Sequence, residues 1–272
     1  MTKTILSVIL CGIVCAGFVG WRVHVHASQG PIHVEIVFDA SLSHPEGCQS
    51  LVALAEQSLR TNGVSKDSTI TILVLGDAST ANEPWQLGRY SFPVTTKALE
   101  GKIASTRRQA GLLSDIQHKC ETIRRTPISP IFLGVKQAVA DLYAHGCNAA
   151  SHCRVFVDSD LEENAEMSVK DALNRARNTK FALPTALDNQ GVEISFCGLA
   201  VTARRIVNSS GKKIHRPLPH DQGHEDGLRQ VWRSLFTQPE LVTFEPYCSS
   251  STDPGVTSNW GGVQEGRPEP VK

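Results

Sequence analysis

Three oxygen-bearing side chains follow directly on an apolar run near residue 40 of this chain. Asp39, Ser41 and Ser43 come after residues 32–38, a run rich in β-branched residues that predicts a β-strand. In open α/β sheets, ligands bind at the edge formed by the carboxyl ends of the strands. One carboxylate and two hydroxyls at this spacing can converge on a hard cation such as Mg²⁺, which takes oxygen ligands. Residues 39–43 can also be explained as the end of a strand followed by a hydroxyl-rich helix cap. Taken alone, these five residues favour this structural interpretation over a metal site.

Two later segments supply further oxygen ligands. Thr126 precedes a predicted helix, and the short hydrophobic run 154–157 leads into Asp158, Ser159 and Asp160. Each segment has a purely structural interpretation, as a helix cap or as a turn. If both follow strands of one sheet, however, their side chains meet at the edge that carries the first group.

In this order and on these elements, the three segments resemble a von Willebrand factor A domain with a metal-ion-dependent adhesion site. That family has Asp-x-Ser-x-Ser in its first loop, a threonine before a helix in its second, and an aspartate after Ser or Thr in its third. The resemblance implies a metal site made of Asp39, Ser41, Ser43, Thr126 and Asp160. Asp158 is the alternative ligand in the third loop. Arg125 and Leu161 stand where the family often has glycine.

The resemblance covers roughly residues 32–247 and implies an α/β fold with a doubly wound, mostly parallel sheet flanked by helices. It implies a divalent cation, Mg²⁺ before Mn²⁺ or Ca²⁺, held by neutral hydroxyls and oriented by aspartates behind them. Such a cation keeps an open position that attracts a carboxylate from a protein partner. The resemblance therefore implies a binding module and not an enzyme.

Two other functions remain open. A scaffold could keep the same fold without using the metal. A metal-dependent hydrolase would use Asp39 with the later aspartates for phosphoryl chemistry. The haloacid-dehalogenase-like pattern, however, needs a second aspartate where this chain has Ser41.

The elements that must position these residues alternate as in βα units. The patterns predict strands over residues 32–38, 68–75, 87–94, 154–157 and 192–201. They predict helices over residues 49–60, 96–120 with a break near Gly111, 131–143, 168–179 and 227–236. Residues 202–226 are expected to form an irregular polar connection whose three histidines are incidental.

Charge and length exclude some classes of protein. Lys+Arg and Asp+Glu each number 27, so the basic footprint of a nucleic-acid-binding protein is absent. The 272 residues, 40% of them hydrophobic, suffice for one large core with tails. We expect a signal peptide or anchor over 1–30, one domain over 31–248, and a disordered tail over 249–272 that is rich in Ser, Gly, Pro and Glu.

The N-terminus and the cysteines both indicate export. Residues 5–21 form an apolar run after Lys3, which predicts either a membrane anchor or a signal peptide cleaved after Ala27. Either places the rest of the chain on the periplasmic or extracellular side. Disulfides are then expected among the six later cysteines, Cys48, Cys120, Cys147, Cys153, Cys197 and Cys248. Cys147 and Cys153, which flank a short polar loop, are the first pair expected to bond.

Overall fold

A computed structural model describes residues 31–42, 44, 47–59, 68–80, 83–91, 100–147, 152–163, 186–198, 201–207, 213–219, 222–245 and 248. Several predictions fall on other residues: the N-terminal segment 1–30, Ser43, the helix over 168–179 and the tail 249–272. These lie outside the described residues.

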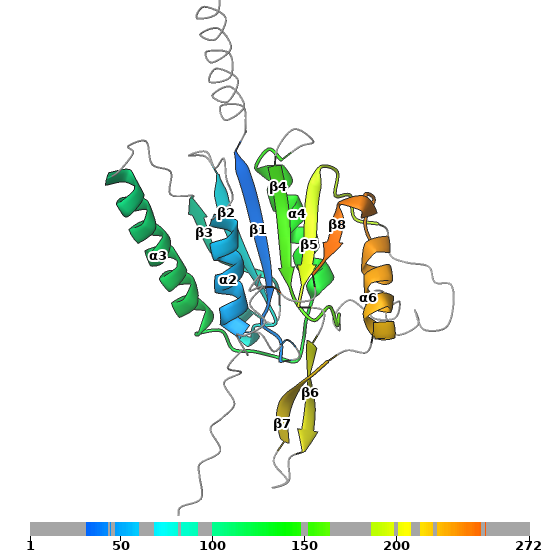
Figure 1. Ribbon diagram of the computed structural model, residues 1–272. Helices are drawn as coiled ribbons and strands as arrows, with labels where there is room; N and C mark the ends of the chain where they lie inside the picture. The colour runs from blue at the N-terminus through cyan, green and yellow to red at the C-terminus, as the bar shows by residue number, and fades with distance from the viewer. Residues whose placement is uncertain are drawn as a thin grey trace, which may run out of the picture.

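The core of the fold is a six-stranded sheet with the strand order β3-β2-β1-β4-β5-β8 (Figure 1). Its strands are β1 (Ile32–Asp39), β2 (Thr69–Leu75), β3 (Trp85–Ser91), β4 (His152–Asp158), β5 (Val192–Cys197) and β8 (Val242–Phe244). All neighbouring pairs are parallel except β2 with β3, which are antiparallel. The chain runs outward from β1 in both directions, so the strand order reverses beside β1. Ligands of open α/β sheets bind at such a reversal.

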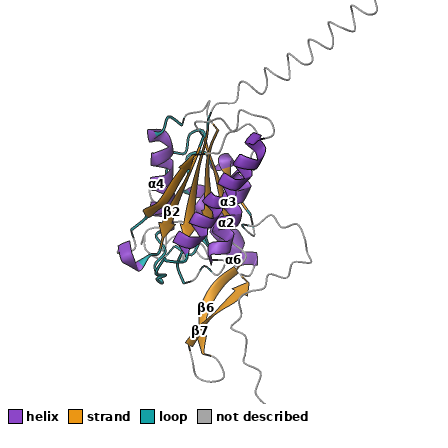
Figure 2. Cartoon of the chain, turned by 90° about the vertical axis from the view of Figure 1, so that its left-hand side faces the viewer, coloured by secondary structure: helices purple, strands orange, loops and turns teal. Residues whose placement is uncertain are grey.

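Helices cover both faces of this sheet (Figures 1 and 2). They are α2 (Gly47–Leu59), α3 (Glu100–Cys120), α4 (Ile131–Ala144) and α6 (Gln222–Ser234), with short 3₁₀ turns η1 (Ala78–Thr80) and η2 (Pro239–Leu241). The apolar faces of α2 and α3 pack into one hydrophobic cluster, and those of α4 and α6 into another. The expected α/β architecture, with a mostly parallel sheet between helices, is therefore present.

Strand β1 separates the two clusters because its side chains alternate between the faces of the sheet. Val34, Ile36 and Phe38 join the cluster under α2 and α3, whereas Val37 joins the cluster under α4. The sequence of a strand that is buried on both faces is a nearly continuous apolar run. This is why the sequence predicts β1 so plainly.

Several predictions about elements are wrong. Helix α3 continues through Gly111 without a break. That residue is exposed, and glycine in an exposed helix costs only about 1 kcal/mol. The predicted strand over 192–201 ends at Cys197, and the predicted irregular stretch over 202–226 contains regular structure.

The unpredicted structure is an antiparallel hairpin of β6 (Val201–Val207) and β7 (Lys213–Pro219). Pro217 and Pro219 lie in β7, although proline cannot donate a hydrogen bond to a neighbouring strand. Each strand of a two-stranded ribbon has one unpaired side, so proline is tolerated there. Helix α6 then begins at Gln222, five residues earlier than expected.

Three disulfides join the six cysteines: Cys48–Cys120, Cys147–Cys153 and Cys197–Cys248. The expected Cys147–Cys153 bond is confirmed. Disulfides persist in oxidising compartments, as expected for an exported chain. Among the described residues, no helix has the length and apolar character needed to cross a membrane.

Candidate functional site

Asp39 ends β1 at the centre of the sheet's carboxyl edge and is completely buried. One of its oxygens, Oδ1, accepts the backbone N–H of Ser41 at 2.8 Å. The other, Oδ2, accepts the hydroxyls of Ser129 at 2.6 Å and Ser159 at 2.8 Å. This carboxylate therefore ties together the loops that follow β1 and β4 and the segment that precedes α4.

Ser129 and Ser159 are functional candidates that the predicted ligand set does not contain. Ser159 had a signal in the sequence, because the family has Ser or Thr before its third-loop aspartate. Ser129 follows Thr126 by three residues, and no spacing in the sequence marks it as a partner of Asp39. Both hydroxyls orient the carboxylate, as groups behind a metal ligand commonly do.

Thr126 lies between the first loop and the end of β2. Its backbone N–H donates to Gly76 O at 2.9 Å, and its carbonyl accepts the Leu42 N–H at 2.8 Å. Its hydroxyl donates to the Gly76 carbonyl at 3.2 Å. Thr126 does not cap α4, because the helix begins at Ile131 with Pro130 at its N-cap. The structural interpretation of Thr126 as a helix cap is therefore wrong.

Gly76, directly after β2, makes this close approach possible. Its φ of +69° is unfavourable for other residues, and a Cβ atom there would lie 2.8 Å from Ile128 O and 3.0 Å from Ser41 N. The loop after β1 and the segment before α4 both approach Gly76 so closely that only glycine fits there.

Asp160 in the third loop is buried, and its Oδ1 accepts the Glu162 N–H at 3.2 Å. Leu161, where the family often has glycine, has a φ of 61°. The backbone therefore keeps the left-handed turn without the glycine. Leu161 is held by its buried side chain and by the Trp232 indole, which donates to its carbonyl at 3.1 Å.

Asp158 belongs to a different set of contacts, on the α2 side of the sheet. Its Oδ2 accepts the Ser50 hydroxyl at 2.5 Å, and its Oδ1 lies 2.6 Å from His44 Nε2. Asp158 is in register with Phe38, whose ring joins the cluster under α2. With both oxygens engaged there, Asp158 is the weaker candidate, and Asp160 stays the third-loop ligand that we favour.

His44 is the titratable group at the centre of these carboxylates. Its complete burial lowers the pKa, but Asp158, and after it Asp39 and Asp160, outweigh that effect and raise the pKa to about 9. His44 is therefore positively charged at neutral pH.

Arg125, in the segment before α4, donates hydrogen bonds to the backbone of the loop that follows β1. Its Nε donates to Ala40 O at 2.9 Å, and its Nη2 donates to Ser41 O at 2.5 Å and to the His44 carbonyl. Burial lowers the pKa of Arg125, whereas Asp39 and Asp158 raise it, and a guanidinium stays charged in proteins. The residue that departs from the family pattern thus holds the backbone at Ala40, Ser41 and His44.

The donor types at this edge are those that a hard cation takes. Asp39, Ser41, Thr126 and Asp160 offer carboxylate and hydroxyl oxygens, the ligands that Mg²⁺, Mn²⁺ and Ca²⁺ prefer. Ser43 would be the remaining ligand. A soft-metal site is excluded nearby: Asp158, Cys197 and Cys248 lie close enough to share an ion, but the disulfide leaves no thiolate to bind it.

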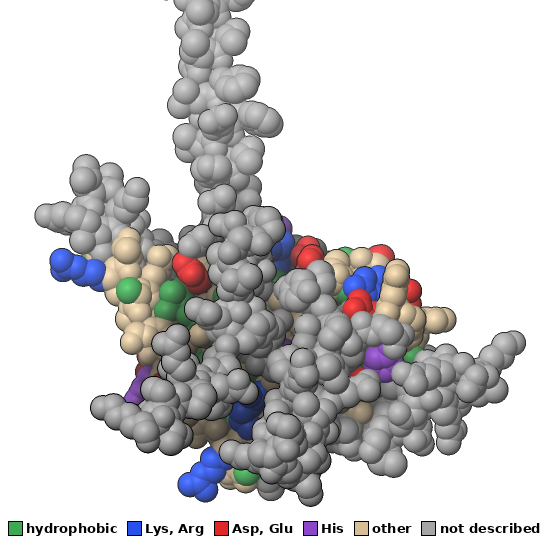
Figure 3. All heavy atoms as spheres, turned by 60° about the horizontal axis from the view of Figure 1, so that its bottom comes forward, with side chains coloured by type: hydrophobic (Ala, Val, Ile, Leu, Met, Phe, Trp, Pro, Cys, Tyr) green, Lys and Arg blue, Asp and Glu red, His purple; other side chains and the backbone are tan. Residues whose placement is uncertain are grey.

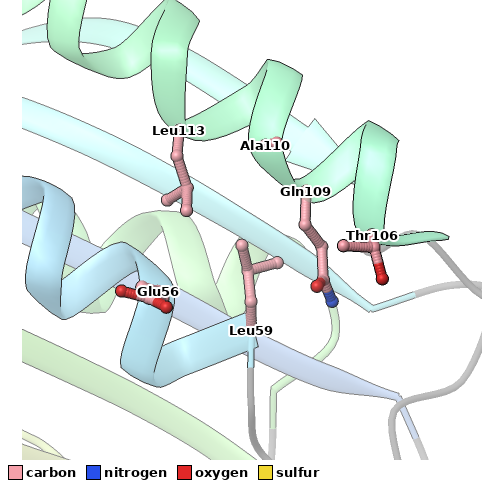
Figure 4. Close-up of a pocket in the computed structure, with 6 residues that line it drawn as sticks. All are labelled: Glu56, Leu59, Thr106, Gln109, Ala110 and Leu113. Carbon is pink, nitrogen blue, oxygen red and sulfur yellow. The ribbon is translucent and has the colours of Figure 1, made fainter. Parts of the chain in front are cut away.

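A shallow hollow of about 180 Å³ lies between α2 and α3, away from this edge (Figure 4). It is lined by Glu56, Leu59, Thr106, Gln109, Ala110 and Leu113. Leu59 ends α2, whereas the other end of that helix adjoins the candidate site. The hollow is therefore separate from the metal-ligand candidates.

Comparisons with known proteins give weak likenesses. No family model matches the chain, and no curated protein matches it. Proximal thread matrix protein 1 from the mussel byssus is similar with a TM-score of 0.43 and 12% identity, over 81% of this chain and 45% of that one. Manganese-loaded TRAP protein of Plasmodium vivax is similar with a TM-score of 0.35 and 11% identity, over 61% of this chain and 57% of that one. The chain thus spans about half the length of each, and likeness at this level assigns no function.

Proposed function

We propose that this chain is a von Willebrand factor A-type binding module that uses a divalent cation to bind an acidic group of a protein partner. The observation that supports this most is the hydrogen bonding of Asp39 to Ser41, Ser129 and Ser159. It joins the segments of the three-part motif at the strand-order reversal, where α/β sheets bind ligands.

In this proposal, the hydroxyls of Ser41, Ser43 and Thr126 would hold the cation, and Asp39 and Asp160 would orient the ligand shell. Neutral hydroxyls leave most of the charge of the cation uncompensated. The cation, Mg²⁺ before Mn²⁺ or Ca²⁺, would supply Lewis acidity for a carboxylate of the partner. Arg125 and the buried hydroxyls do the positioning, because they fix the loops before the partner arrives.

We also propose that the module acts outside the cytoplasm. The three disulfides support an oxidising compartment. The apolar run over residues 5–21 would tether the domain to a membrane, or a cut after Ala27 would release it.

A metal-independent scaffold is the second candidate, and one observation favours it. Arg125 and the protonated His44 already bring two positive charges to the three carboxylates Asp39, Asp158 and Asp160. These cations offset part of the charge that would attract a metal.

Calorimetric titration of Mg²⁺ and Mn²⁺ into the purified protein separates the two candidates. The Ser41→Ala variant removes one proposed ligand, and Ser91→Ala, an exposed serine on the distant edge strand β3, is the matched control. Saturable binding that is lost in Ser41→Ala and kept in Ser91→Ala would support the metal site. Absence of binding in the unmodified protein would favour the scaffold.

A further inference from the structure

The hairpin of β6 and β7 extends from the edge of the sheet that carries the candidate metal site. β5 ends at Cys197 on this edge, and β6 begins four residues later and continues beyond the sheet (Figure 1). Figure 3 turns this edge toward the viewer. Among the described strands, β6 and β7 pair with each other in a sheet of their own. Anything bound at the site would therefore lie beside the hairpin.

The hairpin carries a strong local excess of positive charge. Residues 194–220 contain no Asp or Glu, but they contain Arg204, Arg205, Lys212, Lys213 and Arg216, as well as His215 and His220. The chain as a whole has no net charge. This stretch therefore carries a local excess of positive charge, although Glu193 and Asp221 flank it directly.

The strand register places two arginines at opposite positions. Arg204 pairs with Arg216, and the next pair is Arg205 with His215. Residues opposite each other in an antiparallel pair share a face, and like charges there are destabilising. The register therefore places Arg204 and Arg216 on one face of the ribbon, so an acidic segment along this face would meet positive charge from both strands.

The C-terminal tail does not supply a compensating charge. In residues 249–272, Asp253, Glu265 and Glu269 are nearly balanced by Arg267 and Lys272. A separate acidic molecule is the better match.

The composition of the hairpin favours a protein as that molecule. Neither strand contains Phe, Tyr or Trp, the side chains on which single-stranded nucleic acids stack. Ile206 and Ile214 occupy opposite register positions, two residues along from Arg204 and Arg216. Mixed apolar and arginine surfaces are typical of protein interfaces.

We propose that the β6–β7 hairpin is an electrostatic docking arm for an acidic segment of the protein partner. The segment would lie along the hairpin while one of its carboxylates reaches the metal site. Only this second part rests on the proposed function. Complementary charge would raise the association rate and fix the orientation of the partner.

The test measures binding of a fluorescent oligoglutamate peptide to the full chain by anisotropy, in Mg²⁺ and in EDTA. The docking variant is Arg204→Glu with Arg216→Glu, and Arg204→Gln with Arg216→Gln is a milder version. The control is Arg107→Glu with Arg108→Glu, an exposed pair on α3. Circular dichroism and Mg²⁺ calorimetry verify that each variant keeps the fold and the metal site.

We expect the double reversal to weaken peptide binding at least about tenfold in both buffers, the neutral variant less, and the control within about twofold. Affinity should also fall as salt rises. Unchanged binding by the hairpin variants, or no binding by the unmodified protein, would overturn the proposal. Tighter binding of heparin or single-stranded DNA than of oligoglutamate would also overturn it, because the partner would then not be a protein.

The Ser41→Ala variant distinguishes this proposal from the metal proposal. If it binds the peptide as well as the unmodified protein does, but the hairpin variant does not, the docking arm stands and the metal-dependent function fails. If only Ser41→Ala weakens binding, the metal site stands and the docking arm fails.

Discussion

Leu161 combines a left-handed backbone with a fully buried side chain, and these two demands oppose each other. Glycine would relieve the backbone, which costs other residues about 1–2 kcal/mol at such a φ. Glycine would also lose the buried side chain, which is worth about 2–5 kcal/mol. The burial term is the larger one, so leucine can persist in this turn.

We predict that Leu161→Gly destabilises the protein less than Leu161→Ala does. Both variants lose the packing of the leucine side chain, but only Leu161→Gly also relieves the backbone strain. Elsewhere alanine is the more stable of the two by about 0.5–1 kcal/mol. Urea denaturation of the two variants measures the order. A more stable Leu161→Ala would show that the turn at Leu161 is unstrained.

Gly76 permits a second comparison at the scale of the residue. Gly76→Ala should cost at least about 2 kcal/mol, because its Cβ would both strain the backbone and meet Ile128 O and Ser41 N. Gly146, with a φ of +85° and open space around its Cβ position, is the control. Gly146→Ala should cost only the strain. Equal losses in thermal unfolding would contradict the close contact at Gly76.

Single residues also show how far the sequence predicted the site. Asp39, Ser41, Thr126 and Asp160 belong to a motif whose order along the chain can be read without a structure. The role of Arg125 could not be predicted from the sequence, because its hydrogen bonds go to backbone carbonyls that any residue could supply. Its role depends on how closely two loops approach each other, and this is set by the sheet.

At the scale of elements, the disulfides enclose very different lengths of chain. Cys48–Cys120 joins the start of α2 to the end of α3 across 72 residues, whereas Cys147–Cys153 spans 6. A cross-link restricts the unfolded chain more when it closes a longer loop. The first disulfide should therefore contribute more to stability.

We predict that Cys48→Ala with Cys120→Ala lowers the free energy of unfolding by about 4 kcal/mol. Cys147→Ala with Cys153→Ala should lower it by about 2 kcal/mol on the same loop-entropy basis. Guanidinium denaturation of both variants at one pH provides the comparison. A larger loss for the short loop would indicate that native-state contacts dominate.

Element by element, the sequence predicted best where the apolar pattern is long and regular, as in β1, β2 and α4. It did not predict β8, because a strand of three residues carries too little pattern. It also did not predict β6 and β7. Their arginines, lysines and prolines are typical of a surface connection, and their pairing becomes visible only when the ribbon has formed.

At the scale of the whole molecule, Glu35 couples stability to pH. It lies within β1, almost without exposure to solvent. Burial, and less strongly Asp141, raise its pKa from 4.5 to about 8, against the opposing effects of Thr71 and Arg89. Between these pH values the folded protein keeps a proton that the unfolded chain releases. The stability that Glu35 contributes is therefore lost as pH rises from about 4.5 to about 8.

Glu35→Gln should remove this dependence and leave a neutral side chain of similar shape. Relative to the unmodified protein, we expect the variant to gain on the order of 3 kcal/mol between pH 4.5 and pH 8. Glu193→Gln, an exposed position on β5, should show no such gain. Urea denaturation across this range measures both. Parallel pH profiles for Glu35→Gln and the unmodified protein would mean that Glu35 is ionised in the fold.

Strand β1 connects the two ends of the domain, because it begins at Ile32 on one edge of the sheet and ends at Asp39 on the other. Whatever precedes the strand is joined to the domain about 25 Å away from the edge where a partner would be held. A pull between that attachment and a bound partner runs along β1. The load would be shared by seven registered residue pairs with β2 and seven with β4, all loaded in shear at once. A strand that is buried on both faces of the sheet would thereby also carry the tension.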